Sequence, residues 1–506
     1  MKYILTNSQI RDTDESAIEE YGIPSVVLME NAARSSAEYI VDILSKKFDY
    51  NADILILCGS GNNGGDGFAV ARQMQSHFNV RIVMIGNQEN MSPETGTNFH
   101  AALKLGIPCI HLTDSEEIPN TDFYADCIID AMIGVGGSEN IRGIAAEILK
   151  TIKNINALKI AIDAPSGLNT DSGAASPDCF KADYTVTMFA IKRGMLLKSG
   201  PDYCGKVLTA YLGAPDFIVR NNADIFSLED ADIKKMIPER QRVSSKFDYG
   251  KVVVIAGSKK YPGAAALCAN AAITSGAGLV HLYTTVIHSS LMPEVIPHIM
   301  SATKDGSISD RGINIILKDA ERADTVVIGP GLGTNPETLS CVRKVLEKVS
   351  ENTTVVIDAD GLKTLDDKYI MSKNVILTPH TGELARITGI PRKEIEDDSA
   401  RLTLDWAEQL NCIILLKHVP VFISDGEISY WNTNGNPGMA TGGMGDVLAG
   451  IIAGLSACGA EPLQAAAAAA YIHGKAGDLY AEKYSQLSLT ASRLSDCLEE
   501  VTAKLL

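Results

Sequence analysis

The 506-residue sequence has little positive charge and no long hydrophobic run. Lys and Arg number 45 against 62 Asp and Glu, which gives a net charge of −17. This balance argues against a protein that coats nucleic acid, because phosphate binding needs clustered basic side chains. No apolar run approaches the ~18 residues of a membrane span, and the N-terminus is polar from Thr6 onward, unlike a signal or transit peptide. We expect neither nucleic acid nor a membrane as a partner.

Paired metal-binding motifs are also missing. The ten cysteines occur singly, with no CxxC pair, and the nine histidines show no HExxH spacing. This pattern argues against a zinc ribbon or a disulfide framework and favours free thiols in a reducing compartment, so we expect a cytoplasmic protein. With 45% hydrophobic and 21% charged residues, the composition is that of an ordinary globular protein.

Two series of short, β-branched apolar runs alternate with helical patterns. The runs span residues 54–59, 81–86, 127–132, 159–164 and 184–189, and then 251–257, 325–331, 354–360, 374–380 and 412–418. Buried runs separated by helices are typical of parallel sheets covered by helices on both faces. A polar stretch over 221–250 separates the series, so we predict two α/β domains, 1–225 and 226–506. Ligands of such sheets bind at the carboxyl ends of the strands.

A glycine-rich segment follows the first run. It reads Ser60-Gly61-Asn62-Asn63-Gly64-Gly65-Asp66-Gly67, and we expect the next helix to begin at Phe68. Glycines between a strand and a helix allow a ligand to approach the backbone, and the helix start offers free amides to an anion. The alternative is a tight turn without a ligand.

Oxygen-bearing side chains stand at the ends of the third and fourth runs of this half. Asp130 ends one run, and Asp163 and Ser166 end the other. Together with Asn63, the side chains of Asp130 and Ser166 offer an all-oxygen site that suits a monovalent cation at least as well as Mg²⁺. Lys192 after the fifth run adds a cation that can neutralise substrate charge or move protons. Helix or turn capping by the aspartates and a solvated lysine remain the alternatives.

The first half resembles NAD(P)H-hydrate epimerases. The motifs LMENAA (28–33), NNGGDG (62–67), DAMIGVG (130–136), IDAPSG (162–167) and FAIKRG (189–194) occur in order across about two hundred residues. The resemblance implies a Rossmann-like sandwich, K⁺ held by Asn63, Asp130 and Ser166, and Asp163 and Lys192 as the acid–base pair for epimerisation at C6 of the hydrated nicotinamide ring. It implies that the hydrated dinucleotide is bound by Asp163 together with Asn62, Asn63, Gly64, Gly65, Asp66, Gly134, Val135, Gly136, Gly137, Ser138, Glu139 and Asn140.

The second half carries a longer glycine-rich segment, Asn436 to Gly450. Gly442, Gly443 and Gly445 precede an apolar helical pattern, and successive amides at a helix start form a concave anion site. Asp446 falls in the expected first helical turn, where a carboxylate can take a proton from a hydroxyl that attacks a phosphoryl group. The alternative is a carboxylate that only complements the helix dipole.

Other strand ends of this half point to the same cleft. They comprise the small-residue helix start at 262–272, the turn at 329–333, Asp358, Asp360, His380 and Lys417. His380 can hydrogen-bond a ligand amide or phosphate, and Lys417 can meet nucleotide phosphates. A structural histidine and a salt-bridged lysine are the alternatives.

From about residue 228 to the end, the chain resembles the ribokinase-like ADP/ATP-dependent NAD(P)H-hydrate dehydratases. The motifs are YPGAA, GPGLG, DADGL, TPHTGE and GNPGMATGGMGDVLAG. The resemblance implies that the hydrated dinucleotide contacts Ala264, Ala265, Gly333, His380 and Asp446. It implies that the adenine nucleotide contacts Lys417, His418, Val419, Pro420, Val421, Gly442, Gly443, Met444 and Gly445. The family usually has Gly at position 418 and Ser or Thr at position 444, so the preference between ADP and ATP stays open.

These resemblances predict a bifunctional enzyme that repairs hydrated NADH and NADPH. The first domain would interconvert the R and S epimers with K⁺, and the second would dehydrate the S epimer with ADP as co-substrate and Mg²⁺. A small-molecule kinase would use the same anion loop and Asp446, and a dinucleotide-binding scaffold would have lost acid–base groups that this chain retains. A homo-oligomer is the expected assembly.

Overall fold

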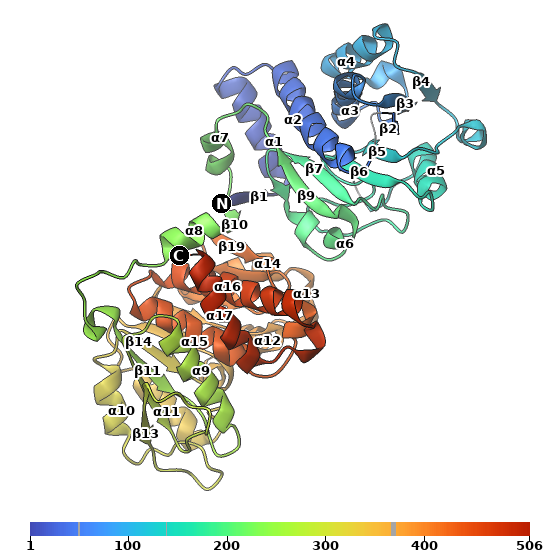
Figure 1. Ribbon diagram of the computed structural model, residues 1–506. Helices are drawn as coiled ribbons and strands as arrows, with labels where there is room; N and C mark the ends of the chain where they lie inside the picture. Colours follow the sequence, from blue (N-terminus) through green and yellow to red (C-terminus); the bar gives the residue numbers. More distant parts are fainter. Residues whose placement is uncertain (49–50, 138, 366–370, 506) are drawn as a thin grey trace. The chain divides into compact units, whose positions relative to one another are not determined.

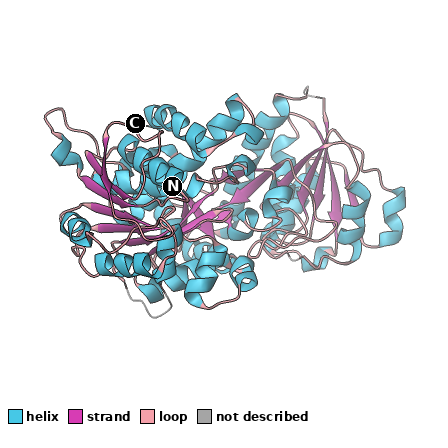
Figure 2. Cartoon of the chain, turned by 90° about the horizontal axis from the view of Figure 1, so that it is seen from below, coloured by secondary structure: helices cyan, strands magenta, loops and turns pink. Residues whose placement is uncertain are grey.

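The computed structural model describes residues 1–48, 51–137, 139–365 and 371–505. By its internal contacts the chain divides into two units, Lys2–Asp224 and Ile225–Leu506, with Met1 grouped with the second. Both units are α/β, with strands flanked by helices on both faces (Figures 1 and 2).

The N-terminal unit is built on a parallel sheet of seven strands in the order β4-β3-β2-β5-β6-β7-β9. The strands are β2 (Asp53–Cys58), β3 (Asn79–Ile85), β4 (Cys109–Leu112), β5 (Cys127–Ala131), β6 (Leu158–Ile162), β7 (Tyr184–Met188) and β9 (Lys206–Ala210). A short parallel pair joins β1 (Lys2–Leu5) to β8 (Ile191–Lys192). The order reverses between β2 and β5, which places a ligand crevice beyond their carboxyl ends.

Alternate residues of the N-terminal sheet bury opposite faces. Ile54 and Ile56 pack in the same cluster as helices α2, α3 and α4, whereas Leu55 and Leu57 pack with helix α5. The helices of this unit are α1 (Asn7–Glu15), α2 (Ser25–Ser45), α3 (Asn62–Met74), α4 (Pro93–Lys104), α5 (Gly143–Ile152), α6 (Gly200–Cys204) and α7 (Asp216–Asn221). The β2 strand is therefore buried on both sides, as its continuous apolar sequence predicts.

The C-terminal unit has a mixed sheet. From β13 to β17 the order is β13-β12-β11-β14-β15-β16-β17 and all pairs are parallel, but β18 and β19 pair antiparallel before a parallel β10. The strands are β10 (Ile225–Ser227), β11 (Lys251–Ile255), β12 (Leu279–Thr284), β13 (Val295–Ile299), β14 (Thr325–Ile328), β15 (Thr354–Ile357), β16 (Val375–Leu377), β17 (Ile413–Leu416), β18 (Val421–Ser424) and β19 (Ser429–Asn432).

Two helices of small residues position the second glycine-rich segment. Their close contact needs glycine, because a Cβ on Gly450 of α15 would lie 2.3 Å from the Cys268 carbonyl of α9, and one on Gly454 would lie 2.5 Å from that of Ala272. The helices of this unit are α8 (Asp230–Met236), α9 (Pro262–Thr274), α10 (Ile313–Ala320), α11 (Pro336–Leu346), α12 (Thr381–Thr388), α13 (Arg392–Asp397), α14 (Ser399–Leu410), α15 (Met444–Ala457), α16 (Pro462–Lys483) and α17 (Ala491–Leu505).

The structure confirms the α/β class and all ten predicted strands, and it corrects two details. The second sheet is not wholly parallel, because β18 pairs antiparallel with both β17 and β19, and this hairpin lies between β17 and β10. Helix α3 begins at Asn62 and not at Phe68, so most of the predicted glycine loop forms the first turns of the helix. All ten cysteines are free. Among the described residues, no helix combines the length and apolarity needed to cross a membrane.

Candidate active sites

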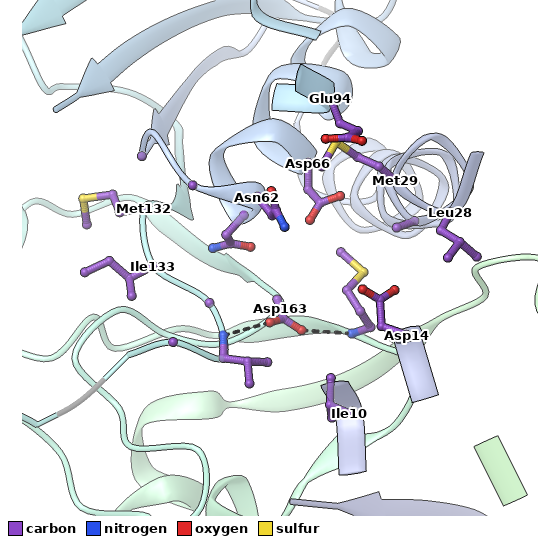
Figure 3. A pocket seen from close by; sticks show the side chains of 18 of the residues that line it. Ile10, Asp14, Leu28, Met29, Asn62, Asp66, Glu94, Met132, Ile133 and Asp163 are labelled. Carbon is purple, nitrogen blue, oxygen red and sulfur yellow. Dashed lines mark hydrogen bonds between the residues drawn. The ribbon is translucent and has the colours of Figure 1, made fainter. Parts of the chain in front are cut away.

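A cavity of about 640 Å³ lies at the point where the strand order of the N-terminal sheet reverses. Its lining comes from the segments after β2 (Gly59–Asn63) and β5 (Met132–Gly136), together with side chains of α1, α2 and α3. Figure 3 shows the carboxylates of Asp14, Asp66 and Asp163 around this space. A cavity of this size suits a small organic ligand.

Asp163 is the most constrained carboxylate of the cavity. It follows β6 with a φ of 63°, an uncommon value for a residue with a side chain. Its Oδ2 accepts a hydrogen bond from the Val135 amide at 3.1 Å, and its Oδ1 accepts one from the Met188 amide at 3.3 Å (Figure 3). Strained backbone of this kind persists where surrounding contacts fix it, often at functional sites.

Lys192 lies behind Asp163 and does not line the cavity. Its fully buried ammonium donates to Asp163 Oδ1 at 2.5 Å, to Thr187 Oγ1 at 2.8 Å and to the Met188 carbonyl at 2.9 Å, which uses all three protons. Burial lowers the pKa of Lys192, while the adjacent Asp163 carboxylate opposes that change. The sequence analysis paired Asp163 with Lys192, and the two side chains are in contact. Of the two, only Asp163 lines the cavity.

A second acid in the cavity has a strongly altered pKa. Burial raises the pKa of Asp66 well above its ordinary value, and the carboxylate of Asp163 adds to this effect. Partial desolvation also raises the pKa of Asp14, on α1. The sequence analysis missed Asp14 because its segment reads as an ordinary polar helix, and only the fold brings α1 to the cavity.

Asp130 and Ser166 are joined by hydrogen bonds, and the side-chain amide of Asn63 has no hydrogen-bond partner among the described residues. Asp130 accepts from the Ser166 amide at 2.7 Å and from Ser166 Oγ at 2.8 Å. Burial raises the pKa of Asp130 to about 6. The buried Asn63 amide has no hydrogen-bond partner on either atom within the described part of the chain. Such a buried oxygen, with hydroxyl and carboxylate oxygens on the neighbouring strands, fits a hard monovalent cation.

The glycines of the first motif serve close packing as well as ligand approach. A Cβ on Gly64 would lie 1.8 Å from the Gly59 carbonyl, and one on Gly65 would lie 2.6 Å from Thr95 Oγ1. Gly134 touches the site itself, because its Cβ would lie 2.7 Å from Asp163 Oδ2 and 3.2 Å from Asn63 Cγ.

The remaining residues expected in the first site lie nearby, on α3 and on the loop after β5. Asn62 accepts a hydrogen bond from Ser92 at 2.9 Å, and Glu139 accepts one from Asn169 at 3.0 Å. The Gly137 amide donates to the Gly134 carbonyl at 2.9 Å, and this hydrogen bond closes a turn that contains Val135 and Gly136. Asn140 is exposed at the end of this loop. Ser138 lies outside the described residues.

Asp446 occupies the first turn of α15, as its position in the sequence predicted. Gly443 caps the helix with a φ of 93°, which only glycine adopts freely, and Gly442 is exposed. Burial raises the pKa of Asp446 to about 7, with a further contribution from the Asp358 carboxylate and an opposing one from Lys417. A carboxylate that titrates near neutral pH is suited to general base catalysis.

Asp358 and Lys417 form an ion pair next to the start of α15. The Lys417 ammonium lies 2.7 Å from Asp358 Oδ1, which also accepts from Thr378 Oγ1 at 2.7 Å. Burial acts to lower the pKa of Lys417, but the facing carboxylates, Asp358 first, raise it overall. A Cβ on Gly445 would lie 3.3 Å from Lys417 Nζ, which places this ion pair against the first turn of α15.

The order of the C-terminal sheet reverses between β11 and β14, and other predicted residues gather there. Ser258 Oγ donates to the Gly331 carbonyl at 2.8 Å, and a Cβ on Gly331 would lie 2.8 Å from the Ala264 Cβ. The Gly333 amide donates to Asp360 Oδ2 at 2.9 Å. Ala265 is buried at the start of α9. These contacts join the turn after β14 to the N-terminal end of α9.

His380 and the segment after β17 were expected to contact ligands, and the structure gives His380 a structural contact as well. His380 Nδ1 accepts from the Gly382 and Glu383 amides at 3.0 and 3.3 Å and so caps α12, which matches the structural alternative, although the ring remains exposed. The ring of His418 stacks on Phe422 at 5.6 Å, and its Nδ1 has no partner among the described residues. Beyond it lie Val419, which is exposed, Pro420, which is buried, and Val421, which begins β18.

Met444, the second departure from the resembled family, does not present its side chain to the anion loop. The side chain is buried in the main hydrophobic cluster of the C-terminal unit, so only the backbone of residue 444 borders Gly443 and Gly445. The backbone amides of the first turn remain in place to meet an anion.

Asp163 therefore lies against the cavity at the reversal point of the first sheet, and Asp446 lies beside Asp358 and Lys417, which follow β15 and β17 of the second sheet. Carboxylates at the carboxyl ends of such strands are typical of a two-domain α/β enzyme. Comparisons with known proteins identify the family. The family model for the YjeF-related protein N-terminus matches residues 25–194, and the model for NAD(P)H-hydrate dehydratase matches residues 252–500.

Relatives match both units together. The bifunctional NAD(P)H-hydrate repair enzyme of Moorella thermoacetica is 34% identical, over 99% of this chain and 97% of its own length. The enzyme of the same name from Coxiella burnetii is 33% identical over 98% of each chain. The crystal structure of a ribokinase-like superfamily protein from Enterococcus faecalis matches 56% of this chain and 96% of its own, with 28% identity and a TM-score of 0.50. The chain belongs to the family of bifunctional NAD(P)H-hydrate repair enzymes.

Proposed function

We propose that the chain performs two consecutive steps on NADH or NADPH that has added water at C6 of the nicotinamide ring. The unit Lys2–Asp224 interconverts the R and S epimers, and the unit Ile225–Leu506 dehydrates the S epimer. ADP is consumed in the second step and yields AMP and phosphate. The observation that supports this assignment is that one chain carries both Asp163, against a cavity, and Asp446, with a pKa near 7, at the start of a glycine-capped helix.

In the epimerase site, Asp163 acts as the base. The hydrated carbon C6 is a hemiaminal, and it inverts when its bond to N1 opens and recloses on the other face of the ring. Asp163 takes the C6 hydroxyl proton as the C6–N1 bond breaks and the carbonyl forms, and the protonated Asp66 supplies a proton to N1. Reclosure returns both protons. Lys192 is a positioning residue here, because its buried ammonium pairs with the Asp163 carboxylate from behind.

K⁺ belongs to the same proposal. Asn63, Asp130 and Ser166 would hold it, and the unpartnered amide of Asn63 is the feature that fits it. A bound monovalent cation would supply positive charge beside the negative groups of the substrate. Asp130, whose two carboxylate oxygens already accept from Ser166, would be oriented for this role without further rearrangement.

In the dehydratase site, Asp446 takes the proton of the C6 hydroxyl as its oxygen attacks the β-phosphoryl group of ADP, and AMP leaves. The amides at the start of α15 stabilise the phosphoryl charge. The ring nitrogen's electron pair then expels phosphate from C6, and loss of a proton from C5 restores the dihydropyridine. The S epimer of the hydrate and ADP thus give NADH or NADPH, AMP and phosphate.

Mg²⁺ and the adenine nucleotide would lie against the same turn. The carboxylate of Asp358 is a hard donor that fits Mg²⁺, which would neutralise the charge of the nucleotide phosphates when bound, and Asp446 stays free to act as the base. Lys417 and the segment through Val421 would line the nucleotide, with the amides of Gly442 to Gly445. We further propose that the enzyme is cytoplasmic and homo-oligomeric.

The experiment is recovery of absorbance in the reduced-nicotinamide band from mixed R and S NADHX with ADP, Mg²⁺ and K⁺. The wild-type enzyme should recover the full absorbance, from both the R and the S epimer. Asp446→Ala should recover none, and Asp163→Ala should recover only the S fraction at first, followed by slow spontaneous epimerisation. Failure of wild type with both ADP and ATP would overturn the proposal. A K⁺-free assay should slow epimerisation alone, and equal rates with and without K⁺ would remove the cation from it.

A further inference from the structure

Two histidines and an aspartate meet on the C-terminal sheet, away from either acid–base group. His281 lies on β12, His298 on the neighbouring edge strand β13, and Asp319 on α10. One ligand atom of each lies within 4.8 Å of those of the other two. All three side chains are only partly buried, so ions can reach them. No short sequence motif joins them, because the fold alone brings the three segments together.

The separations resemble those of ligands that share one metal ion. His281 Nδ1 lies 3.0 Å from His298 Nε2 and 3.5 Å from Asp319 Oδ2. Two nitrogens bound to one Zn²⁺ at about 2.0–2.1 Å lie about 3.3 Å apart in tetrahedral geometry. The ligand atom of His281 thus lies, from each of its two partners, close to the separation expected for a shared metal ion, and the ligand atoms of His298 and Asp319 lie within 4.8 Å of each other.

Neighbouring groups already orient two of the three side chains. The Tyr283 ring stacks on His298 with ring centres 4.5 Å apart, and its hydroxyl donates to Asp319 Oδ2 at 2.5 Å. Lys251 pairs with the other carboxylate oxygen, Oδ1, at 3.2 Å, which leaves Oδ2 facing the histidines. Outer groups that fix ligand orientation in this way are typical of metal sites.

The cluster is separate from the proposed phosphoryl-transfer site. Val280 and Leu282, which alternate with His281 along β12, pack in the hydrophobic cluster that contains α9 and α15. Successive side chains of a strand point to opposite faces, so His281 and Tyr283 lie on the face of the sheet that is away from Asp446. A ligand at this cluster would not be the Mg²⁺ or the nucleotide of the dehydratase step.

We propose that His281, His298 and Asp319 bind one divalent transition-metal ion, with Zn²⁺ as the preferred occupant. Two imidazoles and one carboxylate match the ligand preferences of Zn²⁺ and Co²⁺ over those of Mg²⁺. Three protein ligands leave a fourth tetrahedral position for water or an added anion, because the cluster is open on its exposed side.

The test is titration of chelator-treated, tag-free full-length protein with Zn²⁺ by calorimetry and with Co²⁺ by visible absorption. Wild type should bind one equivalent with tetrahedral Co²⁺ bands, and Zn²⁺ should raise Tm. His298→Ala and His281→Gln should each weaken binding by more than about 100-fold, and Tyr283→Phe, which only orients Asp319, by about 10-fold. His288→Ala, which removes a partly buried histidine of the same unit outside the cluster, should bind as wild type does.

The proposal would be overturned by no bound equivalent in wild type, by unchanged affinity in both histidine variants, or by a sulfur-to-cobalt charge-transfer band that assigns the ion to cysteine. Asp358→Asn should retain the equivalent, and its loss there would place the ion in the dehydratase site. If His298→Ala fails to fold, as far-UV circular dichroism would show, Asp319→Asn replaces it, since this change keeps the size of the side chain.

Discussion

The two units hold the carboxylates that we propose as catalytic in contrasting ways. Asp163 is fixed by a buried ammonium and two backbone amides, on a residue with positive φ. Asp446 stands in a helical turn, where burial brings its pKa to about 7. The first arrangement keeps the Asp163 carboxylate in one position, which suits the reversible proton transfer that we propose for it. The second prepares a base that gains a proton once per turnover, beside amides that receive phosphoryl charge.

The largest expected effect separates the two activities. Asp446→Asn removes the base of the dehydratase and should lower its kcat by about 10³-fold, while epimerisation, followed by separation of the R and S forms, should proceed at the wild-type rate. Glu337→Gln, in the first turn of α11, is the matched control and should keep both activities. Equal loss of both activities in Asp446→Asn would show that the two sites are not independent.

Removal of the cation behind Asp163 should produce the next largest effect. Lys192→Met leaves the buried Asp163 carboxylate without its counter-charge. The N-terminal unit should therefore lose about 3–5 kcal/mol of stability, and epimerisation should slow by about 100-fold at neutral pH. A merely structural lysine would not move the pH profile, whereas a positioning lysine moves it toward higher pH.

Lys159→Met is the control for that variant. Lys159 lies on β6 of the same sheet and is only half-buried, so its loss should leave the pH profile of epimerisation unchanged. Dehydration of purified S epimer reports whether the rest of the chain is intact in both variants. An unshifted profile in Lys192→Met would remove Lys192 from the mechanism.

Helix–backbone contact is a feature that the two units share. Gly64→Ala forces a methyl group to 1.8 Å from the Gly59 carbonyl and should cost about 1–3 kcal/mol, or about 5 °C in the Tm of the N-terminal unit. Gly96→Ala, a helical glycine of α4 with open space around it, should instead raise stability slightly. Calorimetry distinguishes them, and equal Tm values would show that the contact relaxes without cost.

The alternation of buried runs and glycine-rich ends predicted the sheets, and it named several of the residues that the structure brings together at the candidate sites, because both features are local in sequence. The sequence did not predict the hairpin of β18 and β19, because its short strands lack a distinctive pattern. The start of α3 was misplaced because glycines favour loops, and only the packing against Gly59 shows why a helix needs them at Gly64 and Gly65. Asp14 was not predicted as a site residue, because only the fold shows that α1 lies against the cavity.

The smallest effect concerns the pKa of Asp446 itself. The base must be ionised to accept a proton, so kcat/KM for dehydration should fall about tenfold per pH unit below about 7 and level off above it. The Asp358 carboxylate is one cause of the raised pKa, so Asp358→Asn should move the inflection to lower pH by less than about one unit. The epimerase should lack this inflection. A shift of the inflection toward higher pH would contradict this prediction. It would mean that Lys417, once its ion pair with Asp358 is lost, stabilises the Asp446 carboxylate less than before.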